Sequence, residues 1–438
     1  MPHRWMSLAS GLAIGLVAAA TAVADPPPSS YASADEGPLQ APLTARVFTE
    51  AVLTHNASLE AMRQAVVAAV AQVRPAGSLD DPMLSVSAAP RTFGTTGGPN
   101  GDVEVSQSFP WWGTLDARRE VARADAEARG EDFDALRLRL AGLARGAFAD
   151  WVYVHRALEI NTANISLLTE LRDVARIRYT TGQAPQEDVL QADVERAMLA
   201  QQRLEWQRDL TTAQSRMNAL LERDPRSPIP APGELPSRSA LPAEEILAQR
   251  ALAHPQLEAL AAEERAAEAQ QRLAQKDRFP KFGVTAGYNN MWAEPAMRPM
   301  VGLSITVPID QGKYRADIDA AHAEARRAAS TLEDERASLL ADLSADYAAV
   351  REAKQSVALY RDQLVPLAES ALNVARTEYG SGHGDFLNVL TAEQHRLDTE
   401  LGLARMQSEY FRALAELDRA SGGGLLESRS AIAPNPTP

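Results

Sequence analysis

The sequence predicts a mainly helical protein with a small β part, in which one order of elements occurs twice. The first observation is a repeat: residues 175–192 (ARIRYTTGQAPQEDVLQA) match residues 375–392 (ARTEYGSGHGDFLNVLTA) without a gap. The second is a long helical pattern at 117–179 with a counterpart at 316–379. The third is two pairs of short segments that alternate apolar and polar residues, as strands do. Because internal repeats set the architecture, both halves are expected to fold alike.

The amino terminus has the features of a secretory signal peptide, residues 1–24. Arg4 is followed by an apolar run from 8 to 20, and Ala22-Val23-Ala24 provides a small-x-small cleavage signal. The run is too short to cross a bilayer as a helix. We therefore expect export, followed by a Pro/Ser-rich linker at 25–43.

The sequence contains no cysteine and has a formal charge of −14. Without cysteine we expect no disulfide, no thiolate metal site and no lipid anchor after the signal peptide. The negative charge argues against nucleic acid and against adhesion to an anionic membrane surface, but not against cations. After residue 25 no stretch of 18 apolar residues occurs, so a membrane crossing would need a β-barrel.

The first repeat, residues 44–223, is expected to contain a helix, a β-hairpin, a very long helix, a turn and a final helix. Thr44 is expected to cap the first helix. The long helix has about 63 residues, which is roughly 90 Å at ~1.5 Å per residue. The other elements are a helix to about 73, strands at 82–90 and 102–109, a turn at 180–185 and a helix at 186–222.

A proline-rich linker at 224–239 precedes the second repeat, residues 240–421, and a flexible tail is expected at 422–438. In each repeat the two shorter helices together nearly equal the long one, which predicts that they stack end to end beside it. The elements of the second repeat are a helix at 240–277, strands at 279–290 and 301–309, a long helix at 316–379, a turn at 380–385 and a helix at 386–420.

The four predicted strands have the length and alternation of tilted membrane-crossing strands, with one apolar and one polar face. Four strands are too few to close a barrel, and open sheet edges are costly in lipid. Symmetric association of identical chains would solve this, and three copies would supply twelve strands. The alternative is a soluble helical array that carries two hairpins on its surface.

The motifs at the two turns resemble those of the TolC-like outer-membrane efflux protein family, over about residues 44–420. The matching residues are Tyr179-x-x-Gly182 with Asp188-Val189-Leu190, the counterparts Tyr379-x-x-Gly382 with Asn388-Val389-Leu390, and VPIDQGKYRADIDAA at 307–321. The segment VSQSFPWWGTLDARREVA (105–122) is similar to the heavy-metal, cation-efflux branch.

This resemblance implies a homotrimer with a 12-stranded barrel in the Gram-negative outer membrane and a long periplasmic α-barrel. It also implies contact with outer-membrane lipid, with a periplasmic adaptor (membrane fusion protein) and with an inner-membrane RND pump. The expected function is a passive exit duct, with heavy-metal cations as cargo. The alternatives are a duct for drugs or other small molecules and, in a different class, a soluble periplasmic coiled-coil adaptor or scaffold.

No enzyme activity, metal site or cofactor is expected, because the sequence has no phosphate-binding loop, nucleophile elbow or metalloprotease motif. The two helix–turn–helix ends are the candidate functional site, where carboxylates would ring the pore and favour cations. The residues expected to line the gate are Glu187, Asp188, Asp193, Asp385, Asn388 and Glu393. The turn residues expected to contact the adaptor are Gly182, Gln183, Gly382 and His383, and the membrane-interface aromatics are Trp111, Trp112 and Tyr288.

Two further observations concern the gate. Asp188 and Asp385 could instead cap the helices beside the turns. The resemblance also implies an acid at the positions of Asn388 and Thr391 and a basic partner at Gly384, and this chain lacks all three. Asp188 is therefore the stronger gate candidate.

Overall fold

The computed structural model describes the compact unit that begins at Leu39. The predicted signal peptide, most of the linker that follows it and most of the predicted tail lie outside the described residues. The described residues are 39, 41–88, 101–238, 240–290, 292 and 294–426.

The helices of the first repeat form as predicted, with one interruption. The predicted first helix is two helices, α1 (Ala45–His55) and α2 (Ala57–Ala76), because the Asn56 side chain accepts a hydrogen bond from Ser58 N at 3.1 Å and starts a new helix. The long helix α3 (Thr114–Thr180) has 67 residues, which is roughly 100 Å at 1.5 Å per residue. After the turn, α4 (Gln186–Leu220) runs back along it.

In the second repeat, His254 separates α5 (Glu244–Ala251) from α6 (Pro255–Asp277) by accepting a hydrogen bond from Gln256 N at 3.1 Å. The second long helix consists of α7 (Gln311–Leu359), a π-helical turn (Tyr360–Leu364) and α8 (Val365–Ser381). Pro366 lies two residues after this turn, and its missing N–H interrupts the regular i to i−4 pattern there. The last helix is α9 (Phe386–Ala420). Among the described residues, no helix combines the length and apolar character needed to cross a membrane.

The four strands form one antiparallel sheet in the order β1-β2-β3-β4, with β1 (Met83–Ala88), β2 (Gly101–Phe109), β3 (Lys281–Asn289) and β4 (Pro299–Thr306). The two predicted hairpins are present, and the pairing of β2 with β3 joins the repeats. The described strands have six to nine residues, and residues 89 and 90 of the first predicted strand lie outside the described residues.

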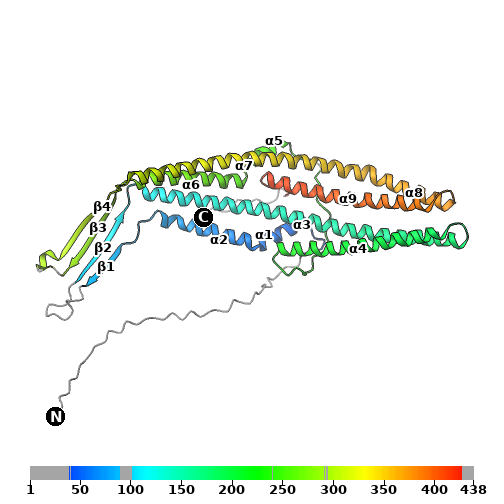
Figure 1. The fold of residues 1–438 in the computed structure, drawn as a ribbon, viewed down its shortest axis with the longest axis horizontal. Coiled ribbons are helices and arrows are strands. Elements are labelled where there is room, and N and C mark those ends of the chain that lie inside the picture. Colours follow the sequence, from blue (N-terminus) through cyan, green and yellow to red (C-terminus); the bar gives the residue numbers. More distant parts are fainter. Residues whose placement is uncertain are drawn as a thin grey trace, which may run out of the picture. The chain divides into compact units, whose positions relative to one another are not determined.

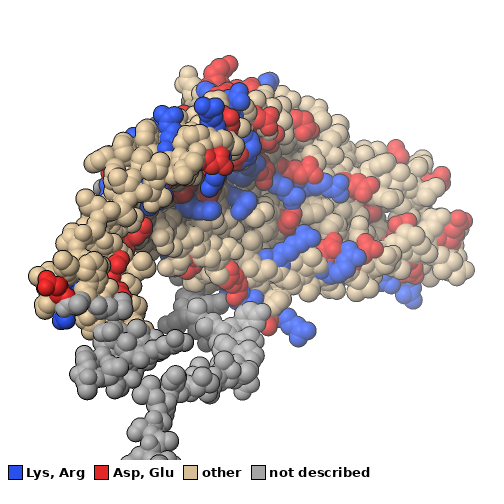
Figure 2. Space-filling view, turned by 60° about the vertical axis from the view of Figure 1, so that its left-hand side comes forward, with Lys and Arg blue, Asp and Glu red and all other residues tan. Residues whose placement is uncertain are grey.

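The sheet exposes many apolar side chains, and most of its surface in Figure 2 is neutral, whereas charged side chains are frequent over the helices. The most exposed are Val301 and Leu303, each 83% exposed. No described strand pairs with the outer edges of β1 and β4. The other exposed apolar side chains of the strands include Met83, Leu84, Val86, Val103, Val105, Val284 and Ile305.

The helices pack as their lengths predicted. The helices α2 and α4 follow one another along α3, and α6 and α9 follow one another along the second long helix (Figure 1). In addition α3 packs against both α6 and α9, so the two repeats form one helical layer. Three apolar clusters stabilise this layer, one of them at the end furthest from the sheet.

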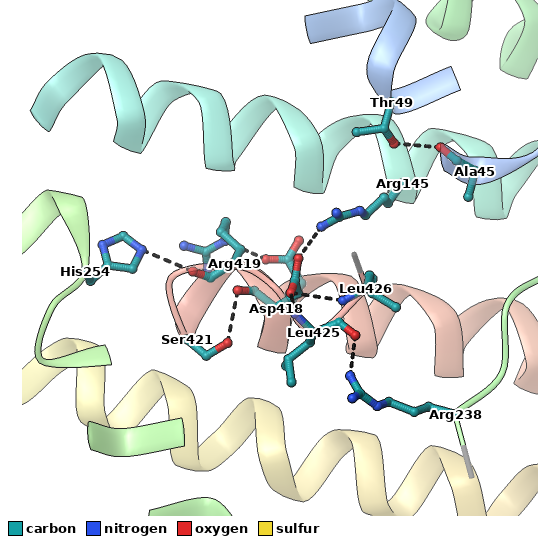
Figure 3. Close-up of polar contacts among 11 residues, drawn as sticks. Ala45, Thr49, Arg145, Arg238, His254, Asp418, Arg419, Ser421, Leu425 and Leu426 are labelled. Carbon is teal, nitrogen blue, oxygen red and sulfur yellow. Dashed lines mark hydrogen bonds and ion pairs between the residues drawn. The ribbon is translucent and has the colours of Figure 1, made fainter. Parts of the chain in front are cut away.

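A buried ion pair connects the repeats where the chain leaves α9 (Figure 3). The Asp418 carboxylate pairs with Arg145 of α3, and their side chains are 1% and 9% exposed. The same carboxylate accepts hydrogen bonds from the backbone N–H groups of Leu425 and Leu426. Arg238, in the linker between the repeats, donates to the Leu425 carbonyl. One carboxylate therefore ties α3, α9 and the chain that follows α9.

We expect Asp418→Ala to lower the free energy of unfolding by about 3–5 kcal/mol, because it leaves the Arg145 guanidinium buried without a carboxylate. Denaturant unfolding followed by circular dichroism measures this. Glu159→Ala is the control, since its ion pair with Arg156 on α3 is more than half exposed and should matter little. Equal stability losses in both variants would contradict the role of Asp418.

Candidate functional site: the two helix tips

The two turns furthest from the sheet have the same backbone geometry. At the first tip, Gly182 has φ 72°, Gln183 N donates to the Arg178 carbonyl and Gly182 N donates to the Tyr179 carbonyl. At the second tip, Gly382 has φ 83°, and the corresponding bonds run from His383 N to Glu378 and from Gly382 N to Tyr379. This is a Schellman helix end, which needs a left-handed residue. This turn explains the glycine of the repeated Tyr-x-x-Gly motif.

A polar cluster, which we call the tip latch, joins the second tip to the first. It consists of Arg178, Asp188 and Tyr379. The Tyr379 hydroxyl donates to Asp188 Oδ2 at 2.8 Å. Arg178 donates to the Tyr379 carbonyl and places its guanidinium 4.7 Å from the centre of the Tyr379 ring. The latch therefore connects α8 with both helices of the first hairpin.

The environment of the latch keeps its tyrosine neutral. Tyr379 is 4% exposed and Asp188 is 9% exposed. Burial, the hydrogen bond to Asp188 and the charge of Asp188 all raise the pKa of Tyr379, in that order. The hydroxyl therefore stays a donor. The Phe386 ring, 5.1 Å from the Tyr379 ring, covers it from α9.

The two tips differ in burial although their turns are alike. Tyr379 and Leu390 are 4% and 7% exposed, whereas their counterparts Tyr179 and Leu190 are 44% and 56% exposed. The second tip packs into the apolar cluster with α3 and α4, while the first tip presents the same residue types to solvent. Large apolar side chains that are more than half exposed near the first tip include Ile177, Leu190, Val194 and Met198.

The structure separates the predicted gate residues. Glu187 is exposed and accepts a hydrogen bond from Gln191 Nε2 at 3.0 Å. Asp193 is neutralised by Arg196 at 3.3 Å and Arg172 at 3.8 Å. Of the six predicted gate residues, only Asp188 belongs to the latch.

The capping alternative is wrong for Asp188, because Pro185 occupies the N-cap of α4 and the Asp188 carboxylate contacts Tyr379 instead. Asp385 occupies the N-cap position of α9, but its side chain accepts no capping hydrogen bond. Asn388, Gln183 and His383 are exposed at the tips.

A groove of about 340 Å³ lies between α4 and α9 close to the tips. Its wall combines apolar side chains with amides, a hydroxyl and two carboxylates. The lining residues are Glu187, Leu190, Gln191, Val194, Glu195, Leu387, Leu390, Thr391 and Gln394.

Glu393 is buried, 3% exposed, on the α9 face that packs against the first hairpin. Its pKa is raised to about 7, chiefly by burial. The charge of Arg396 lowers this pKa, whereas the charges of Glu195 on α4 and of Asp398 and Glu400 on α9 raise it. Arg396 is itself bonded to Glu400 and to Asn164 of α3. Among the described residues, Glu393 Oε1 has no hydrogen-bond partner.

The predicted interface aromatics occupy opposite ends of the sheet. Trp111 and Trp112 lie directly before α3, and Tyr288 lies near the other end of β3, 51% exposed. Trp111 stacks on Phe279 with ring centres 4.8 Å apart.

Sequence reasoning missed Arg178 and the role of Tyr379. The signal that could have identified Arg178 is a break in the repeat, since the second tip has Glu378 at the corresponding position. The sequence has Gly384 where the resemblance implies a basic residue. In the structure, the guanidinium of Arg178 from the first repeat contacts Tyr379 at the second tip.

Two stretches of the chain, residues 49–222 and 247–423, match the family model described as outer membrane efflux protein. The chain belongs to this family. The two matched stretches cover most of the efflux protein and contain both tips. No curated protein matches the sequence.

Solved structures of similar fold support the same architecture. The outer-membrane channel OprN is 22% identical with a TM-score of 0.76, and the match covers 87% of this chain and 90% of OprN. The outer membrane protein VceC from Vibrio cholerae is 21% identical with a TM-score of 0.74, covering 87% of this chain and 96% of VceC. CusC is 19% identical with a TM-score of 0.75, covering 87% of this chain and 92% of CusC.

Within the described ranges, no three or more His, Cys, Asp or Glu side chains are placed to hold a metal ion.

The stability of the efflux protein should fall as pH rises from about 4.5 to about 7. Over this range the folded chain keeps the Glu393 proton that the unfolded chain releases, since the pKa is raised from 4.5 to about 7. The fall is on the order of 1 kcal/mol per pH unit. Thermal unfolding of Glu393→Gln should lack this fall, and the exposed control Glu187→Gln should keep it. An unchanged slope in Glu393→Gln would contradict the assignment.

Proposed function

We propose that this chain is the outer-membrane channel component of a tripartite efflux system and acts as a passive exit duct. The observation that carries the proposal is the open four-stranded sheet with exposed apolar side chains, joined to two long helical hairpins. Three copies would pair their β1 and β4 edges and close twelve strands into a barrel in the outer membrane. The hairpins would form a periplasmic α-barrel that ends at the tips.

The tips act as the gate in this proposal. The tip latch holds α8 against α3 and α4, so opening the duct requires the bond between Tyr379 and Asp188 to break. A hydrogen bond to a charged group stabilises the closed arrangement by about 1.5–3 kcal/mol. Glu187, Asp385 and Asn388, which are exposed, are available to line the narrowed end and to favour cations.

The tip surfaces support the choice of partners, and the sequence supports the choice of cargo. The groove between α4 and α9, with the turn residues Gly182, Gln183, Gly382 and His383, contacts a helical hairpin of a periplasmic adaptor, which links the duct to an inner-membrane RND pump. Heavy-metal cations are the cargo. Segment 105–122 and the formal charge of −14 support this choice.

Loss of the latch should favour the open duct. We expect Asp188→Ala and Tyr379→Phe to raise single-channel conductance or open time in planar bilayers, because the closed arrangement loses a bond that shifts its equilibrium by about 10- to 100-fold. Tyr179→Phe, the exposed counterpart in the first repeat, is the matched control and should conduct like the wild type. Unchanged currents in both latch variants would remove the gate assignment.

Cell fractionation tests the duct itself. The protein should remain in the outer membrane until detergent is added and should migrate as a heat-resistant trimer. A monomer that is freely soluble in the periplasm would refute the duct and favour a soluble adaptor or scaffold.

Deletion of the gene tests the cargo. Heavy-metal salts should inhibit growth of the deletion strain at lower concentrations than they inhibit the parent. A strain that becomes sensitive only to drugs would assign the duct to small organic molecules instead.

A further inference from the structure

Lysine is rare in this chain and its positions are not random. Only four of the 44 basic residues are lysines, and the rest are arginines. Three of the four lie where the strands of the second repeat meet the helices: Lys276 in the last turn of α6, Lys281 at the start of β3 and Lys313 at the start of α7. The fourth, Lys354, lies on α7 about 60 Å further along the helix at ~1.5 Å per residue.

The sheet register brings these junctions together. Phe109 at the end of β2 pairs with Phe282, and Lys281 pairs with Thr306 at the end of β4. Lys276 extends toward the neighbouring β2–α3 junction, where its Nζ lies 3.7 Å from the position of a Cβ built on Gly113. The three lysines therefore lie near the end of the sheet that meets the helices.

Aromatic side chains occupy the same junction. Trp111 stacks on Phe279, and Trp112 packs against Phe282 with ring centres 5.5 Å apart. Trp112 nevertheless remains 72% exposed. The guanidinium of Arg278 lies 5.0 Å from the centre of the Phe279 ring and adds a fourth positive charge. Tryptophan beside basic side chains is typical of the headgroup level of a membrane.

Two of the three lysines have no carboxylate partner among the described residues, although the Lys313 ammonium group lies 5.6 Å from the centre of the Tyr314 ring. In the part of the chain that the structure describes, Lys276 and Lys313 form no ion pair, and Lys281 has only Asp277 at 4.0 Å. Many arginines on the helices, by contrast, pair with acids three or four residues away, as Arg327 does with Glu324. Unpaired ammonium groups in a chain of charge −14 indicate an anionic partner outside the chain.

Exposed apolar side chains at the end of β4 and in the segment after it lie close in sequence to this site. Ile305, Val307 and Ile309 are 59%, 59% and 88% exposed and lie just before Lys313 in the sequence. A lysine can lay its aliphatic stem along such a surface and place its ammonium group at the headgroups. The three lysines all belong to the second repeat, so the basic part of the site occupies one half of the sheet.

We propose that Lys276, Lys281, Lys313 and Trp112 form a binding site for the headgroup of an anionic phospholipid, on the membrane surface nearest the helices. The proposal rests on the proposed membrane role of the sheet. The lysines bind the lipid phosphate, Trp112 lies at the headgroup level, and the apolar strand surface contacts the acyl chains. The site fixes the depth of the sheet in the bilayer.

The test uses the full-length purified protein in a mild detergent, titrated with phosphatidylglycerol or with zwitterionic phosphatidylcholine and followed by native mass spectrometry. The wild type should prefer phosphatidylglycerol. The triple variant K276Q/K281Q/K313Q should weaken phosphatidylglycerol binding by about 100-fold, which is roughly fivefold per lysine. K276R/K281R/K313R should retain the preference, and K354Q is the matched control that should bind like the wild type.

Three results would overturn the lipid site. The first is an equal affinity of the triple glutamine variant and the wild type for phosphatidylglycerol. The second is displacement of the lipid by inorganic phosphate at about 10 mM, which would assign the site to free phosphate. The third is loss of the oligomer with the lipid preference intact, which would assign the lysines to acidic side chains of a second copy.

Conductance of the same samples in planar bilayers separates this inference from the proposed function. Wild-type protein that conducts but shows no lysine-dependent lipid preference would refute the lipid site and leave the duct standing. Protein that binds phosphatidylglycerol through the lysines but never conducts would refute the duct alone.

Discussion

The hydrogen-bonding groups along the outer edges of β1 and β4 are the constraint on which the rest of the structure depends. Neither edge meets another described strand, and the apolar side chains between them are exposed. A sheet of this kind is stable in neither water nor lipid as a lone unit. The closed ring that we propose satisfies both edges with identical partners, and it brings three copies of each helical hairpin side by side.

Duplication explains the backbone, but it does not explain what each copy contacts. Both tips end in the same left-handed glycine turn, and both repeats stack two shorter helices beside a long one. Yet Tyr379 is buried against the first hairpin, whereas Tyr179 faces solvent. The two copies of the motif therefore make different contacts. One copy packs within the chain, and the other exposes the same residue types.

Three buried carboxylates show how this helical layer handles charge. Asp418 has a guanidinium and two backbone N–H groups, and Asp188 has a tyrosine hydroxyl. Among the described residues, Oε1 of Glu393 has no hydrogen-bond partner. Burial raises the pKa of Glu393 to about 7, because desolvation favours the neutral form of a carboxyl group. Asp418 stabilises the contact between α3 and α9, Asp188 connects the two tips, and Glu393 makes the stability depend on pH.

The sequence by itself determined the repeat, the long helices, the hairpins and the turns, because periodicity, proline and glycine act locally. It also placed Asp188 beside the first turn. Only the tertiary structure decided that Tyr379 and Arg178 meet there and that β2 pairs with β3. Those outcomes depend on contacts between residues up to about 200 positions apart, as between Asp188 and Tyr379 with a separation of 191, and no local pattern encodes them.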